Sequence, residues 1–235
     1  MIISVINHAF ATVTDAKLQQ VLRAVNRQIE GDYAPYWSLG ATLRLEGRSG
    51  KQPSKQSLSD MRGDAVLYVW DSVDVDDALG YHDTNHRGIP YGFVFTELSR
   101  QMGEPWSVTL SHEALELIGD PEVNLLVMGP HPRDLGRDVF HWYEMCDAVQ
   151  AETYEIDSIE VSNFVLPLYF TVDSKKGSRN DFFATTSSDG SRLPSFGLNP
   201  GGYIGFPELD DHDTYFADAV ARRRAEIKSQ LGFAR

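Results

Sequence analysis

A histidine and two glutamates stand close together in the run Ser-His-Glu-Ala-Leu-Glu-Leu-Ile-Gly-Asp-Pro, which spans residues 111–121. If this run is a helix, His112 and Glu116 lie one turn apart on the same face, about 6 Å from each other. An imidazole nitrogen and a carboxylate oxygen at that spacing can chelate one divalent metal ion. Glu113 follows the histidine and can accept a proton. The run therefore predicts a metal site with a neighbouring general base.

The spacing is that of the His-Glu-x-x-His zinc sites, in which two histidines bind the metal and the glutamate is the general base. Here Glu116 stands in place of the second histidine. A carboxylate oxygen is an acceptable ligand for Zn²⁺, but it is harder than an imidazole nitrogen and carries a negative charge. That charge lowers the Lewis acidity of the metal, which predicts a slower enzyme, a higher pH optimum or no catalysis. We expect one divalent ion, with Zn²⁺ as the first choice.

The elements that must position this helix precede it in the chain. Short apolar and β-branched runs predict strands at 2–6, 41–45, 65–70 and 91–95. Apolar residues at helical spacing predict a helix that begins after Thr14 and stops at Gly31. The stretch 80–90 is rich in turn residues, and Pro90 favours an edge position for the strand at 91–95. Pro105 starts the metal-site helix, which ends near Ile118.

The second half of the chain has a different pattern. Short strand-like runs occur at 123–128, 139–143 and 153–170, with a hairpin turn at Asp157-Ser158. Residues 175–207 are rich in Gly, Ser, Asn and Pro, which is typical of irregular structure. Residues 213–231 carry apolar side chains roughly at helical spacing and predict a closing helix.

Composition limits the possible partners. The 235 residues carry a net charge of −13, which argues against nucleic-acid binding and against anionic membranes, because both need a basic surface. The single cysteine, Cys146, excludes an intramolecular disulfide and a cysteine-rich zinc finger. The first residues lack the pattern of a signal peptide, and no stretch reaches the ~20 apolar residues of a membrane span. We therefore expect a soluble cytoplasmic protein.

The order of expected elements over residues 2–118 is strand, helix, strand, strand, edge strand and metal-site helix, which resembles the upper subdomain of the zincin metallopeptidases. The resemblance implies an α+β fold with a mixed twisted sheet, an active-site helix and a less regular C-terminal subdomain. It implies one domain, 1–235, with subdomains 1–121 and 122–235. It also implies cleavage of a peptide or protein substrate by a metal-bound water, with Glu113 as general base. The zincin edge strand pairs with extended substrate, a role that falls here to Phe93 and Phe95.

A third metal ligand must come from outside the helical pair, and three carboxylates are candidates. Asp-Pro after the helix and a later Glu-x-x-Asp (Glu144, Asp147) are similar to zincin-like sequences that include the plant Exordium-type proteins. The gluzincin arrangement then implies Glu144 as the third ligand and Asp147 as a brace for the histidine. Asp120 could share the metal only if the helix breaks at Pro121. Glu122 occupies the last place of the pattern His-Glu-x-x-His-x-x-Gly-x-x-His.

Two more residues are candidates for the active site of the expected peptidase, and two other interpretations of the sequence are open. His82 and Tyr169 are polar residues flanked by apolar or turn residues, and they are candidates to stabilise the oxyanion. The main alternative is a catalytically inactive zincin-like binding or structural protein that retains a structural metal. A third interpretation is an α/β domain without a metal, since a solvated helix face has the same pattern of charges as the run at 111–121.

Overall fold

The computed structural model describes residues 1–46, 63–71, 80–85, 87–134, 136–172, 175, 177–186, 190–207 and 212–222. The chain divides into two compact units. The first contains Met1–Val123 and Tyr154–Val161, and the second contains Asn124–Thr153 and the residues from Ser162 onward. The described residues form helices, a mixed sheet and smaller antiparallel sheets, in agreement with the expected α+β class.

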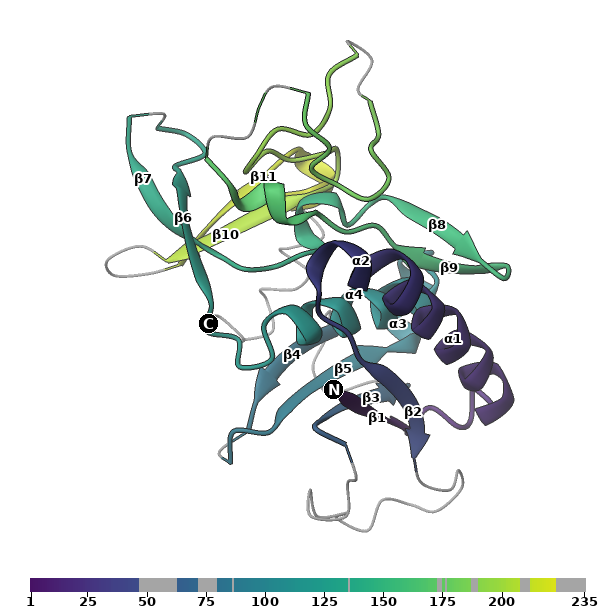
Figure 1. The fold of residues 1–235 in the computed structure, drawn as a ribbon. Helices are drawn as coiled ribbons and strands as arrows, with labels where there is room; N and C mark the ends of the chain where they lie inside the picture. The colour runs from purple at the N-terminus through teal and green to yellow at the C-terminus, as the bar shows by residue number, and fades with distance from the viewer. Residues whose placement is uncertain are drawn as a thin grey trace. The chain divides into compact units, whose positions relative to one another are not determined.

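The first unit contains a five-stranded mixed sheet (Figure 1). Its strands are β1 (Ile2–Asn7), β2 (Thr42–Glu46), β3 (Ala65–Trp70), β4 (Gly80–Thr84) and β5 (Pro90–Phe95), in the spatial order β2-β1-β3-β5-β4. The strands β1, β2, β3 and β5 are parallel, whereas β4 is antiparallel to β5 and forms one edge. The apolar runs of β1 and β3 fit their inner positions, where most of their residues are buried.

The edge strand is not the one that the sequence predicts. The strand β5 pairs with β3 on one side and with β4 on the other, so the backbone around Phe93 and Phe95 is occupied by neighbouring strands. The prediction that this segment forms the edge and pairs with substrate is therefore wrong. Pro90 lies opposite Thr84 at the end of the ladder, where the missing N–H interrupts no inner pair. The stretch expected to be a turn supplies the true edge strand, β4.

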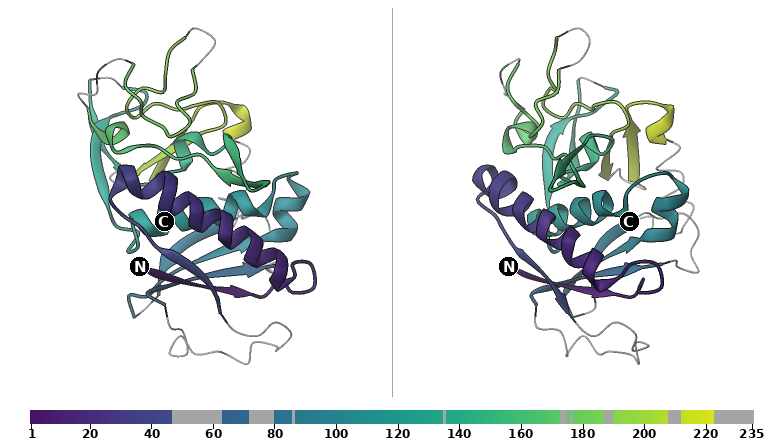
Figure 2. Two further views of the ribbon diagram at one scale, coloured as in Figure 1. Left: turned by 45° about the vertical axis from the view of Figure 1, so that its right-hand side comes forward. Right: turned by 90° about the vertical axis from the view of Figure 1, so that its right-hand side faces the viewer.

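The two long helices of the first unit, α1 (Asp15–Gln28) and α4 (Trp106–Gly119), cover the same face of the sheet (Figure 2). The Thr14 hydroxyl accepts a hydrogen bond from the Lys17 N–H at 3.2 Å and caps α1 as predicted. The predicted stop at Gly31 is wrong, because the chain continues through a π-helical turn, η1 (Ile29–Tyr33), and α2 (Ala34–Trp37). Burial of Tyr33 and Trp37 offsets the roughly 1 kcal/mol that a helical glycine costs. The short helix α3 (Thr96–Gln101) precedes α4.

The hairpin of β8 (Thr153–Ile156) and β9 (Ile159–Ser162) confirms the turn predicted at Asp157-Ser158. Both turn residues have positive φ, 52° and 62°, the conformation that a two-residue hairpin requires. Most of the hairpin belongs to the first unit, where the Tyr154 hydroxyl donates to Asp32 Oδ2 at 2.8 Å. Gln28 Nε2 donates to the same hydroxyl at 3.1 Å. The hairpin is thus fastened to the end of α1 and to η1.

The second unit is built from short antiparallel pairs. The strands β6 (Leu126–Pro130) and β7 (Asp138–Trp142) form one pair, and β10 (Tyr203–Pro207) and β11 (His212–Phe216) form another. Two 3₁₀ turns, η3 (Asp147–Val149) and η4 (Pro167–Phe170), lie between these strands in sequence. The run at 153–170 predicted as strand therefore ends in a helical turn, which Pro167 starts.

The predicted closing helix at 213–231 is wrong at its beginning. Residues 213–216 lie in β11, where Thr, Tyr and Phe at 214–216 favour a strand paired with β10. A helical turn occurs at 219–222, and Asp218 Oδ1 caps it by accepting from the N–H groups of Val220 and Ala221 at 2.9 Å each. The remaining residues of the prediction, 223–231, lie outside the described residues.

Candidate metal site

The helix α4 carries the three residues of the predicted site. Every residue of this helix from 107 to 119 is buried. His112 is 7% exposed, and Glu113 and Glu116 are 3% exposed each. A solvated helix face is therefore excluded for this segment. Ionisable groups this deeply buried need charged or hydrogen-bonding partners, and glutamates are almost never fully buried unless they are paired.

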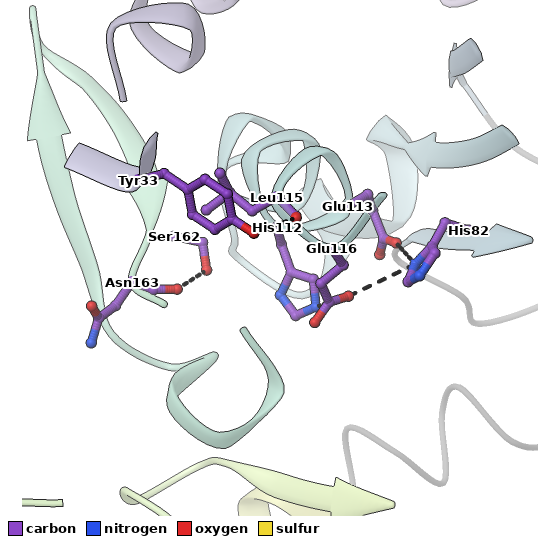
Figure 3. Close-up of polar contacts among 8 residues, drawn as sticks. All are labelled: Tyr33, His82, His112, Glu113, Leu115, Glu116, Ser162 and Asn163. Atoms are coloured by element: carbon purple, nitrogen blue, oxygen red, sulfur yellow. Dashed lines mark hydrogen bonds and ion pairs between the residues drawn. The ribbon is translucent and has the colours of Figure 1, made fainter. Parts of the chain in front are cut away.

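The first metal-binding pair has the predicted geometry. His112 Nε2 lies 3.1 Å from Glu116 Oε2, across one turn of α4 (Figure 3). Two ligands that each lie about 2.0–2.1 Å from a tetrahedral Zn²⁺ are about 3.3 Å apart. The donor set and its spacing therefore fit a divalent metal without a change in the helix.

The edge strand β4 brings His82 to the same place. His82 is 2% exposed, and its Nδ1 lies 3.3 Å from Glu113 Oε2 and 3.8 Å from Glu116 Oε2. Figure 3 shows the imidazole pointing toward both carboxylates of α4. One ligand atom from each of His82, Glu113 and Glu116 lies within 4.8 Å of the others, so this buried group could hold a metal ion. The structure thus places His82 beside the proposed general base.

Gly80 is a site residue that the sequence reasoning missed. A Cβ atom at Gly80 would lie 2.7 Å from Glu113 Oε1 and 2.7 Å from the Phe93 carbonyl oxygen. Gly80 and His82 are two residues apart on one strand, so they face the same side. In the sequence, Gly80 stands two positions before His82. This spacing indicates that the two residues share a face only when the segment is known to be a strand.

The chain also holds α4 from its other side within the first unit. The hydroxyl of Tyr33, a fully buried residue of η1, donates to the Leu115 carbonyl oxygen at 3.4 Å (Figure 3). Asp120 ends the helix, and its N–H donates to the Glu116 carbonyl oxygen at 2.7 Å. Asp120 is buried but is absent from the metal-ligand group of the described first unit, and Glu122 is exposed beyond the helix. Neither alternative third ligand is supported by this arrangement.

Three predicted site residues belong to the second unit and lie together there. Glu144, Asp147 and Tyr169 line one small pocket with Trp142, Phe170 and Tyr203. Burial, and secondarily the charge of Asp147, raise the pKa of Tyr169 far above its ordinary value, so its hydroxyl stays protonated. That hydroxyl donates to the Gly197 carbonyl oxygen at 2.9 Å. The roles of Glu144 as third metal ligand, Asp147 as brace and Tyr169 as oxyanion donor stay predictions.

Comparison with protein-family models, with curated proteins and with solved structures found no match to this chain. Among the described residues, no helix is both long and apolar enough to cross a membrane. The feature that points to a function is therefore the buried His/Glu group.

Proposed function

We propose that this protein is a metal-dependent peptidase of zincin-like fold, in which His112 and Glu116 bind a divalent ion, Zn²⁺ by preference, and Glu113 is the general base. The observation that carries the proposal is the burial of these three side chains together with His82 in one cluster. The order of elements supports it in part: β1, α1, β2, β3 and the edge strand β4 follow the expected zincin-like order, and one further strand, β5, precedes the helices that lead to α4.

Each residue of the first unit has a distinct part in the proposed reaction. Bound metal supplies positive charge that polarises the scissile carbonyl and lowers the pKa of water. Glu113 takes the proton from the attacking water and passes it to the leaving nitrogen. The outer edge of β4 offers N–H and C=O groups with which an extended peptide can pair. The proposed substrate is therefore a peptide or protein in extended conformation.

A structural metal site is the second candidate, and the depth of the cluster favours it. None of these four residues is more than 7% exposed, whereas a catalytic metal needs an open position for substrate. A second anionic ligand also makes the metal a weaker Lewis acid. In this alternative the ion stabilises the fold and the protein binds its partner without cleaving it.

One comparison of variants separates the two candidates. Protein purified without chelators is analysed for bound metal, and wild type and Glu113→Gln are incubated with casein and with a peptide library. The peptidase predicts stoichiometric metal in both proteins and cleavage by wild type alone. Glu122→Gln changes an exposed glutamate close to the helix and should behave as wild type.

The other outcomes each remove one candidate. Stoichiometric metal with no cleavage by wild type favours the structural site. Equal cleavage by wild type and Glu113→Gln removes Glu113 from the mechanism. Protein that contains no bound metal and takes up none when Zn²⁺ is supplied excludes both.

A further inference from the structure

The edge strand β4 contacts both oxygens of the Glu113 carboxylate. Glu113 Oε1 occupies the space beside Gly80 that a Cβ atom would need, at 2.7 Å from its position. Glu113 Oε2 lies 3.3 Å from His82 Nδ1. Gly80 and His82 face the same side of β4, and their neighbours across the ladder are Val94 and Gly92 of β5.

We infer that Gly80 and His82 are positioning residues that hold Glu113 in one orientation, an inference that rests on the proposed role of Glu113 as general base. A glutamate side chain has three rotatable bonds, and it must lose that freedom before it can act as a base at a fixed point. Because Gly80 has no side chain, there is room beside it for Oε1 of Glu113 in one rotamer of that glutamate. The imidazole of His82 donates from Nδ1 to Oε2 and fixes the other oxygen. The edge strand thus preorganises the base before substrate arrives.

The register of β4 explains why these two residues act together. Thr109, one turn before Glu113 on α4, also lies against Gly80, because its Cγ2 would be 2.7 Å from a Cβ atom there. Strand and helix therefore approach closely at Gly80, and the missing side chain makes this approach possible. His82 follows two residues later on the same face of β4. Because strand and helix are close here, its Nδ1 lies within hydrogen-bonding distance of the Glu113 carboxylate.

An alternative role for His82 is that of a metal ligand, since its Nδ1 also lies 3.8 Å from Glu116 Oε2. The variants His82→Asn and His82→Leu distinguish the two roles. The asparagine amide nitrogen is separated from Cα by the same number of bonds as Nδ1 of histidine, so it can replace the donor to Glu113. An amide nitrogen does not bind a metal and an amide oxygen is not among the usual Zn²⁺ ligands, whereas leucine offers neither a donor nor a ligand.

The test uses crystal structures and metal content of the full-length variants, so that it does not depend on activity. In wild type and His82→Asn, the Glu113 carboxylate should occupy the same position. In His82→Leu and Gly80→Ala it should move or become disordered, while the metal content stays at the wild-type value. Gly31→Ala is the matched control, because a Cβ atom at Gly31 would meet no atom within 4 Å.

Kinetics provide a second readout if wild type cleaves peptides. Misplacement of the base by about 1 Å costs on the order of 100-fold in rate, so His82→Leu should lose about that factor in kcat with KM unchanged. His82→Asn should restore most of the lost activity. Gly80→Ala also presses on the Phe93 backbone and can disturb folding, and the pair of His82 variants tests the inference without it.

Two results would overturn the inference. An unmoved Glu113 carboxylate in His82→Leu shows that the imidazole does not position it. Loss of bound metal in both His82→Leu and His82→Asn identifies His82 as a ligand. Failure of the proposed function is a separate outcome. Wild type would then bind metal without cleaving peptide, but the crystal structures would still show whether His82 positions Glu113.

Discussion

Zinc binding should raise the thermal stability of the protein through His112 and Glu116. Their ligand atoms are 3.1 Å apart in the folded helix, close to the separation of about 3.3 Å expected for two ligands of one tetrahedral Zn²⁺. The unfolded chain does not maintain this spacing, because it depends on one intact turn of α4. The ion therefore binds the folded state preferentially, and its removal should destabilise the protein.

The size of the effect follows from the ratio of free metal to its dissociation constant. At a Zn²⁺ concentration 100 times Kd, stabilisation is about 2.7 kcal/mol, and at 1,000 times Kd it is about 4.1 kcal/mol. For a chain of this size, 1 kcal/mol changes Tm by about 2–4 °C. The lower concentration should therefore raise Tm by about 5–11 °C.

Differential scanning calorimetry of protein stripped with EDTA and titrated with Zn²⁺ measures this shift. His112→Ala should remove it, because Glu116 alone leaves the ion without its nitrogen ligand in the helix. Glu122→Gln, outside the cluster, should retain the full shift. A wild-type Tm that does not respond to Zn²⁺, or an equal rise in His112→Ala, would refute the assignment of this pair as the metal-binding core.

Three further predictions concern the two units. Burial lowers the pKa of His141 from 6.5 in the folded state. The contribution of this residue to stability is therefore complete above pH 6.5 and is lost as the pH falls toward the lower folded-state pKa. Urea unfolding of wild type should give a smaller free energy of unfolding below pH 6.5 than above it, and this decrease should be smaller in His141→Gln. Leu115→Ala removes a fully buried side chain of α4 and should cost about 2–5 kcal/mol in chemical denaturation, whereas Leu168→Ala, at a position 50% exposed, should cost about 0.5 kcal/mol or less. Tyr154→Phe removes the hydrogen bond to Asp32 and should lower the free energy of unfolding by about 1–2 kcal/mol, with faster hydrogen exchange in the 153–162 hairpin.

Local residue patterns were sufficient for elements that repeat a simple period. The helix after Thr14, the inner strands β1 and β3 and the Asp157-Ser158 turn are confirmed, since each depends on neighbours in sequence. The edge of the sheet was not predictable in this way. The sequence of β4, Gly-Tyr-His-Asp-Thr, has few apolar residues, and pairing with β5 alone makes it a strand. Similarly, β11 depends on pairing with β10, which overrides a weak helical pattern.

The same distinction, between features set by neighbours in sequence and features set by contacts between elements, applies to the candidate site. His112, Glu113 and Glu116 were predictable because their relation is contained within one helix. The partnership of Glu113 with His82 and Gly80 was not, because it depends on how β4 lies against α4, and residue spacing along the chain does not encode that approach. His82 was singled out for its chemistry, but its neighbour could be identified only from the fold.

The hairpin of β8 and β9 makes the first unit discontinuous in sequence. Its two segments, Met1–Val123 and Tyr154–Val161, are separated by 124–153, which belong to the second unit. A fragment that ends at Val123 would lack the Tyr154 hydroxyl that Asp32 and Gln28 bind, so a shortened chain that preserves the first unit must extend to Val161. On the ribosome, the first unit can complete its contacts only after the first stretch of the second has been synthesised. The two units are therefore made as interleaved parts of one chain rather than one after the other.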